Sequence, residues 1–159
     1  MRSGMSIPPG FTARQLRMWG LRRDGSSLAS IARRLGVTRQ AVSQAMKGID
    51  EKVIKTLESA AIAAKIEVRH IDPERGVLLG YSLEAGDRVV GTLSTRNGVQ
   101  MWHRFNGRCE ECDLLESCMS VIIDEAEERG VDLTKEDREK YPAEIAHIVF
   151  SRVIPGLEP

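Results

Sequence analysis

Hydrophobic side chains recur at helical spacing through the first third of the chain, and this period predicts three short helices. Thr12 and Gln15 stand three residues apart, which is the spacing of a capping box at a helix start. Gly36 supplies a residue that easily turns left-handed and ends a helix, and Thr38 is placed to cap the next one. The three helices are expected over residues 13–22, 28–35 and 39–47.

The pattern then continues as a longer helix before it changes to the alternation that is typical of strands. An Ala-rich helical face extends over residues 50–68, and its length suits a connector or a dimer interface. Asn97-Gly98 lies between two β-type runs, which is a strong hairpin signal. We expect a three-stranded antiparallel meander with strands at residues 76–82, 88–94 and 99–105. Helices are expected again over residues 114–129 and 142–153, with a short one starting at Thr134.

The segment over residues 28–47 contains the residue types that a helix-turn-helix requires. Ala32 is small where two helices would cross, Gly36 suits the turn, and Val42 would hold the second helix in place. The face left outward carries side chains of the types that bond to base edges and phosphates. These candidate DNA-binding residues are Thr38, Arg39, Gln40, Ser43, Gln44 and Lys47. Together with residues 11–25, the segment resembles the helix-turn-helix of prokaryotic transcription regulators, of the sigma-factor region-four and archaeal Tfx type.

A trihelical packing unit with a solvated basic face is the alternative interpretation, and the distribution of charge favours DNA binding over it. The chain of 159 residues has no net charge at pH 7, but its halves differ. Residues 1–50 contain nine Lys or Arg and two acids, Asp24 and Asp50, while residues 71–159 contain ten Lys or Arg and eighteen acids. A basic segment favours a polyanion as its partner, here double-stranded DNA, with an affinity that falls as salt rises.

Composition narrows the class of protein further. With 42% hydrophobic and 29% charged residues, the chain suits a globular protein. No apolar run is long enough to cross a bilayer, and the N-terminus has no secretory pattern, so we expect a cytoplasmic protein. The sequence shows no Ser/His/Asp arrangement, no phosphate-binding Gly loop and no convincing carboxylate pair, so we do not expect an enzyme.

The three cysteines lie within ten residues, as Cys109, Cys112 and Cys118 in a C-x2-C-x5-C run. A small, odd-numbered set argues against a disulfide framework and for metal or redox chemistry. Zinc sites commonly use two pairs of ligands, whereas an iron–sulfur cluster depends less on paired spacing. The run resembles the cluster-binding segments of RecB-like nucleases and of the auxiliary domains of some radical enzymes. That resemblance implies an iron–sulfur cluster, most simply 4Fe-4S, in proteins that have a fourth cysteine elsewhere.

The chain has no fourth cysteine, so the fourth ligand has to be of another kind. The candidates are His103, Asp113, a nearby Glu or an exogenous small molecule, and we favour His103 because it stands on an adjacent predicted strand. The acidic residues of the segment suit an exposed loop better than the surroundings of an anionic cluster. Zinc, and thiols without metal, are therefore the alternatives to an iron–sulfur cluster.

The whole sequence predicts an α+β protein in three parts. We expect a helix-turn-helix DNA-binding domain over residues 11–48, a connector or dimerisation helix over 49–70, and a β-meander with helices that holds the metal over 71–159. The predicted function is a homodimeric transcriptional regulator that senses redox state, oxygen or iron through a hinge between meander and connector. A zinc-stabilised nucleic-acid-binding or interaction module, and a DNA-anchored redox enzyme, are the alternatives.

Overall fold

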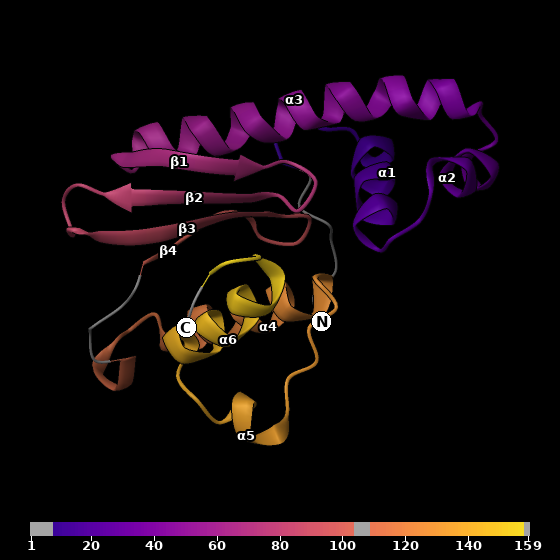
Figure 1. The fold of residues 1–159 in the computed structure, drawn as a ribbon. Coiled ribbons are helices and arrows are strands. Elements are labelled where there is room, and N and C mark those ends of the chain that lie inside the picture. Colours follow the sequence, from indigo (N-terminus) through magenta and orange to yellow (C-terminus); the bar gives the residue numbers. More distant parts are fainter. Residues whose placement is uncertain (1–7, 104–108, 158–159) are drawn as a thin grey trace. The chain divides into compact units, whose positions relative to one another are not determined.

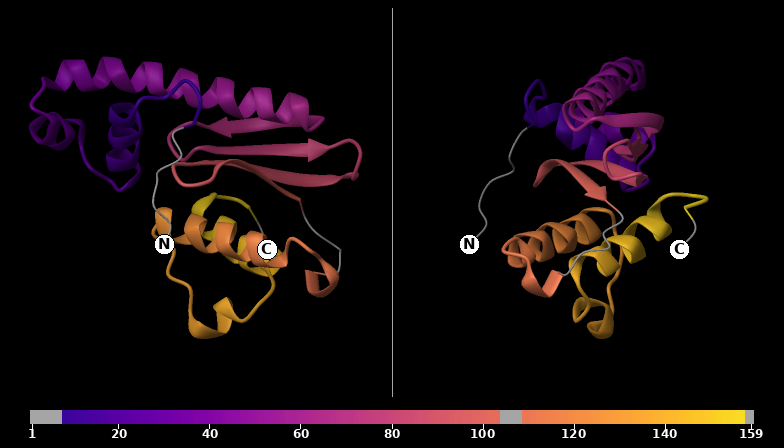
Figure 2. Two further views of the ribbon diagram at one scale, coloured as in Figure 1. Left: turned by 180° about the vertical axis from the view of Figure 1, so that it is seen from behind. Right: turned by 90° about the vertical axis from the view of Figure 1, so that its left-hand side faces the viewer.

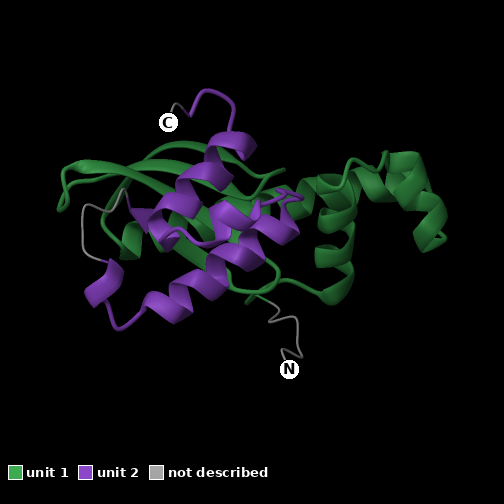
Figure 3. Ribbon diagram, turned by 90° about the horizontal axis from the view of Figure 1, so that it is seen from below, with its two compact units in different colours: residues 1–101 green, residues 102–159 purple. Residues whose placement is uncertain are grey.

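The computed structural model describes residues 8–103 and 109–157. The chain divides into two compact units, unit 1 (residues 1–101) and unit 2 (residues 102–159), which are coloured separately in Figure 3. Helices and one antiparallel sheet are both present, so the α+β class is confirmed. The division after Met101 differs from the boundaries expected near residues 48 and 70, and the packing of unit 1 explains why.

Unit 1 begins with three helices whose starts are fixed by side-chain caps (Figure 1). The backbone N–H of Gln15 donates to Thr12 Oγ1 at 3.1 Å, and the N–H of Thr12 donates to Gln15 Oε1 at 3.0 Å. Gly36 ends the second helix with a φ of 65°, a conformation that costs other residues more. The helices are α1 (Ala13–Arg23), α2 (Leu28–Leu35) and α3 (Arg39–Ala63).

Helix α3 is one continuous element, so the separate recognition and connector helices predicted for this region are wrong. Gly48 does not interrupt it, because the buried stripe that includes Met46, Ile49 and Val53 passes through this position. Burial of such side chains outweighs the roughly 0.5–1 kcal/mol that a glycine costs inside a helix. The helix also ends earlier than predicted, before Lys65, which has a φ of 55°.

The described residues form a four-stranded sheet rather than the predicted three-stranded one. Its strands are β1 (Ile66–Asp72), β2 (Val77–Ser82), β3 (Asp87–Ser94) and β4 (Gly98–His103), in that order across the sheet. The additional strand β1 pairs with β2 from Ile66 opposite Ser82 to Asp72 opposite Val77, with a register shift between Val68 and His70. The part of the predicted last strand at residues 104–105 lies outside the described residues.

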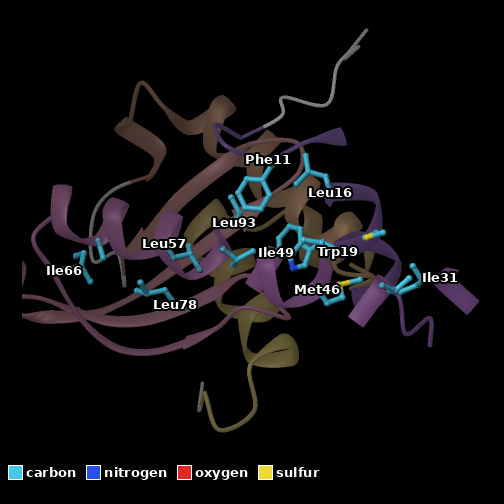
Figure 4. Close-up of a cluster of buried hydrophobic side chains, with 14 of the residues drawn as sticks. Phe11, Leu16, Trp19, Ile31, Met46, Ile49, Leu57, Ile66, Leu78 and Leu93 are labelled. Carbon is cyan, nitrogen blue, oxygen red and sulfur yellow. The ribbon is translucent and has the colours of Figure 1, made fainter. Parts of the chain in front are cut away.

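One hydrophobic core joins the three helices to the sheet within unit 1, as the close-up in Figure 4 shows. Trp19 is fully buried in this core, and its indole N–H donates to the carbonyl oxygen of Pro73 at 3.0 Å. A Cβ atom at Gly76 would lie 2.5 Å from the Trp19 ring, so only glycine fits there. Leu57 is also fully buried, which places the apolar face of α3 on the chain's own sheet. The helices therefore do not form a domain separate from strands β1 to β3.

Unit 2 is built on a pair of helices, α4 (Leu115–Glu128) and α6 (Pro142–Val153), which lie side by side in both views of Figure 2. Ile122, Ile145 and Phe150 are buried, and the rings of Phe150 and Trp102 lie 5.7 Å apart between centroids. The short helix α5 (Lys135–Arg138) starts after Thr134, as predicted. The three predicted C-terminal helices are thus confirmed, with both ends of α4 and α6 and the start of α5 within a residue or two of the prediction.

None of the helices within the described ranges combines the length and the apolar character that spanning a bilayer requires. Helix α3 is long enough, but charged residues recur along it.

Candidate nucleic-acid interface and cysteine centre

A tight three-residue connection sets the start of α3 against α2. The N–H of Val37 donates to the carbonyl oxygen of Ala32 at 3.0 Å, which holds the turn close to the end of α2. Ile31, Ala32 and Val42 are buried between the helices. Thr38 Oγ1 accepts a hydrogen bond from the N–H of Ala41 at 3.1 Å and so fixes the direction in which α3 begins.

The first turns of α3 present the predicted DNA-binding side chains on the surface of unit 1. Five of the six are exposed, and Ser43 is half-buried. The exposed residues are Thr38, Arg39, Gln40, Gln44 and Lys47. Because the oxygen of Thr38 is engaged in capping, the side chains free to reach a partner begin at Arg39.

The surface around this face is rich in positive charge. Exposed arginines lie on α1 and α2 as well as at the start of α3. Among the acids of residues 8–50, Asp50 is bound by Arg22 through two contacts, at 2.5 and 3.2 Å, which leaves Asp24 as the exposed carboxylate. The exposed basic residues are Arg14, Arg17, Arg33, Arg34, Arg39 and Lys47. Arg33 and Arg34 at the end of α2, with Arg39 and Lys47 on α3, place positive charge near the start of α3 that would attract an anionic partner.

Polar contacts hold α1 in a fixed orientation on α3. The Arg22–Asp50 ion pair joins the two helices near the middle of α3, and its partners are 15% and 31% exposed. Two residues further along, the ammonium group of Lys52 donates to Gln15 Oε1 at 3.0 Å and to the carbonyl oxygen of Gly10 at 2.6 Å. The exposed face of α3 is thus supported from behind by both packing and ion pairing.

The three cysteines lie in unit 2, Cys109 and Cys118 on two neighbouring elements and Cys112 between them. Cys109 begins the 3-10 turn η1 (Cys109–Glu111), and the N–H of Cys112 donates to its carbonyl oxygen at 3.1 Å. Cys118 lies in the first turn of α4, where its N–H donates to the carbonyl oxygen of Leu114 at 2.8 Å. All three are free thiols and are half-buried. Cys109 and Cys112 lie close enough to Cys118 for their charges to act on it.

Besides burial, the charges of the other two cysteines affect the pKa of the Cys118 thiol. Burial raises the pKa of the Cys118 thiol, and the nearby charges of Cys112 and Cys109 raise it further. A bound cation would relieve this repulsion, because it favours the deprotonated form of each thiol. The donor set thus suits three corners of an iron–sulfur cluster or three of the four zinc ligands.

The fourth ligand is not in place. Within residues 8–103 and 109–157, no three or more His, Cys, Asp or Glu side chains are gathered in an arrangement that would hold a metal. His103 is exposed at the end of β4 and is not brought into such a group with the cysteines. The thiols would have to draw closer together to hold one metal.

Tyr141 is a neighbour of the cysteines that the sequence analysis did not identify. Its hydroxyl donates to Glu110 Oε2 at 3.0 Å. This hydrogen bond and the charge of Glu110 raise the pKa of Tyr141, and the charge of Cys109 adds to the effect. The two partners are 31 residues apart, so no local pattern in the sequence could have indicated the contact.

Comparison of the chain with models of protein families, with curated proteins and with solved structures gives no match.

Proposed function

We propose that the protein is a DNA-binding transcriptional regulator of the helix-turn-helix type, with a metal or iron–sulfur centre on its three cysteines. The observation that carries the proposal is the exposed polar face at the start of α3, directly after a three-residue turn from α2. In a helix-turn-helix, the second helix enters the major groove and its first turns contact base edges. Arg39 and Gln40 are of the types that bond to guanine and adenine.

The exposed arginines on α1 and α2 support the same proposal from a different direction. Arg33 and Arg34 lie at the end of α2, beside the turn that leads to the exposed polar face at the start of α3. In this class of motif the first helix crosses the phosphate backbone, which such side chains suit. Each phosphate contact makes binding more dependent on salt, because it releases bound counterions.

Selection of duplexes from a random pool tests the DNA-binding function when no operator is known. The full chain should enrich a defined sequence, and its affinity for that duplex should fall steeply between low and moderate salt. A matched variant, Lys55→Ala, removes an exposed charge from α3 beyond the proposed interface and should behave as the unmodified chain does. Enrichment of no sequence, together with binding that does not respond to salt, would contradict the proposal.

We expect the regulator to act as a homodimer, because a single helix-turn-helix of this size binds DNA weakly. Operators with two-fold symmetry also match proteins with two-fold symmetry. The apolar face of α3 is not available for the dimer, since Leu57 is buried in the core of its own chain. A hinge was expected between the β-meander and the connector helix. Instead, α3 and the sheet pack into one shared hydrophobic core. A dimer interface therefore has to use another surface.

Cys109, Cys112 and Cys118 would hold the metal centre in unit 2. A 4Fe-4S cluster would supply a reversible change of redox state, whereas zinc would only stabilise the fold. Three half-buried thiols, with Cys109 and Cys112 close enough to Cys118 to act on its charge, support a metal occupant. A regulator that senses redox state, oxygen or iron follows if the occupant is a cluster.

Isolation of the full chain without oxygen distinguishes the two occupants. A brown protein that bleaches in air and contains iron and sulfide supports the sensor. A colourless protein with one zinc per chain supports instead a zinc-stabilised nucleic-acid-binding module. Protein that contains neither metal would contradict both forms of the cysteine centre.

A further inference from the structure

Strand β1 forms one edge of the sheet, as Figure 1 shows, because among the described strands it pairs with β2 alone. Four consecutive residues in its middle, Glu67 to His70, are exposed. Because successive side chains of a strand point to opposite faces, this run leaves the middle of β1 open to solvent on both sides. The open edge of a sheet is where a further strand can pair.

The charges of β1 are arranged symmetrically around Val68. Glu67 precedes it and Arg69 follows it, and Arg69 Nη1 lies 3.2 Å from Glu67 Oε1. Both charged side chains therefore lie on the same side of the strand, where that of Glu67 is 47% and that of Arg69 is 62% exposed. Val68 itself is 38% exposed, although it is hydrophobic. The order of acid, valine and base reads as its opposite when the strand direction is reversed.

This order selects one way of pairing two copies of β1. In an antiparallel pair, opposite side chains point to the same face, so a two-fold axis between identical strands passes through a residue and not between two. An axis at Glu67 or at Arg69 sets like charges opposite each other, which destabilises the pair. An axis at Val68 instead sets each Glu67 opposite Arg69 of the other copy, and the two Val68 side chains opposite each other. Opposite charges and apolar pairs in these positions stabilise a sheet.

We propose that β1 is the interface of a homodimer, in which it pairs antiparallel with β1 of a second copy about a two-fold axis at Val68. The inference rests on the homodimer of the proposed function, and it names the surface which that dimer uses. Each Glu67 then has one Arg69 beside it in its own chain and another opposite it, so the four charges form a network.

The pairing is short. The register of β1 against β2 shifts between Val68 and His70, and such a bulge bends the strand. Paired residues beyond Arg69 are therefore not expected. Because small interfaces give weak association, the dimer should dissociate as the protein is diluted.

The test measures self-association of the full chain by sedimentation equilibrium over a range of protein concentrations, with a reductant present and without DNA. The variants are Glu67→Lys, Arg69→Glu and the double variant that carries both substitutions. Glu74→Lys is the matched control, because it makes the same change of charge at an exposed position just beyond the end of β1. Circular dichroism establishes that each variant is folded.

We expect the unmodified chain to dimerise, and each single variant to dimerise about tenfold more weakly, because it sets like charges opposite each other twice in the dimer. The double variant exchanges the two charges and restores both ion pairs, so it should dimerise as the unmodified chain does. An equal mixture of the two single variants should also dimerise, since each supplies the charge that the other lacks. Glu74→Lys should match the unmodified chain.

A mixture that associates no more strongly than its two components would overturn the inference, because complementary charges would then not meet across the interface. A dimer that is unaffected by both single substitutions would overturn it as well, and would leave the homodimer intact with its interface elsewhere. A chain that is monomeric at every concentration would overturn both the interface and the homodimer, and would mean that the bulge protects the edge. The selection of duplexes tests DNA binding separately, so a failure of that function is distinguished from a failure of this interface.

Discussion

Arg39 and Gln40 stand exposed in the first turn of α3, where a side chain in the major groove would reach base edges. Substitution of either by Ala should weaken binding to the selected duplex by about 1–3 kcal/mol, the range for loss of a base-reading contact. Fluorescence anisotropy on the selected and a scrambled duplex measures the effect. The loss should be larger on the selected sequence.

Lys47→Ala should behave differently from Arg39→Ala if it contacts phosphate, with a similar loss on both duplexes and a reduced dependence on salt. Equal affinity of all three variants and the unmodified chain, with the fold intact, would contradict the placement of α3 in the groove.

The three cysteines are expected to act as one unit, because a single missing ligand destabilises a whole metal site. Cys109→Ser, Cys112→Ser and Cys118→Ser should each lose most of the metal and destabilise unit 2 to a similar extent. His103→Ala should lose less metal than the cysteine variants, since His103 is exposed at the end of β4 and water can take a fourth position. Metal analysis of the four proteins tests this. Full metal content in one Cys variant alone would contradict a three-thiolate site.

The carboxylate of Asp72 contributes to stability in a way that depends on pH. Burial tends to raise the pKa of Asp72, but hydrogen bonds from the Arg75 side chain and backbone outweigh it, and the pKa falls below its usual value of 3.8. The folded state thus favours the charged form, and this stability is present above the unfolded pKa and lost as the pH falls through the folded pKa. Asp72→Asn should lower the melting temperature at pH 7 and have little effect well below pH 3.8. A constant difference across that range would contradict the assignment.

At the scale of elements, Gly48 is the weak point of α3. It lies inside the helix, and a Cβ atom there would meet no other atom within 4 Å. Gly48→Ala should therefore stabilise the protein by about 0.5–1 kcal/mol, since alanine favours helix more than glycine does.

Gly36→Ala should have the opposite effect. The space around Gly36 is also open, but its φ of 65° would strain any other residue. That variant should be destabilised by roughly 1–2 kcal/mol. Urea unfolding of both variants compares them directly. Stabilisation by Gly36→Ala would contradict the left-handed end of α2.

The accuracy of the sequence analysis also differs from element to element. The caps at Thr12 and Thr38 were predicted because each depends on nearby residues in the sequence, and the helix start at Thr134 was also expected. Strand β1 was missed because Val68 fits the spacing of the preceding helix, and because β1 is an edge strand whose central residues are exposed and show no alternation. Its pairing with β2 across the Asp72 turn is a tertiary contact that outweighs this local pattern.

The candidate sites show the same limit. The outward position of Arg39 and Gln40 followed from the helical period, and the structure exposes both. The contact of Tyr141 with Glu110 joins residues far apart in sequence, and no local period indicates it. The nearness of Cys109 to Cys118 follows from their spacing in the sequence, while His103 as the fourth ligand stays a prediction.

At the scale of unit 1, the burial of Leu57 assigns the apolar face of α3 to the core of the chain and not to a dimer interface. It is fully buried against the chain's own sheet, so Leu57→Ala should destabilise the protein by about 2–5 kcal/mol without changing the oligomeric state of the folded fraction. Ile62→Ala, on the same helix but 77% exposed, should change stability by no more than about 0.5 kcal/mol. Urea unfolding and sedimentation measure the two properties. A Leu57→Ala protein that is as stable as the unmodified chain but has become monomeric would contradict this packing.

The continuity of α3 has a mechanical consequence. Its 25 residues make a rod about 37 Å long. The second half of this rod is fixed to the sheet, and its first turns carry the exposed polar face. Such a rod acts as a lever arm: its free half is about 18 Å long, and rotating the fixed half by about 10° would carry the free end sideways by roughly 3 Å. That displacement is close to the spacing of base pairs along a duplex, about 3.4 Å. In the proposed regulator, a small rotation of the fixed half would then shift the helix by about one base pair along the DNA.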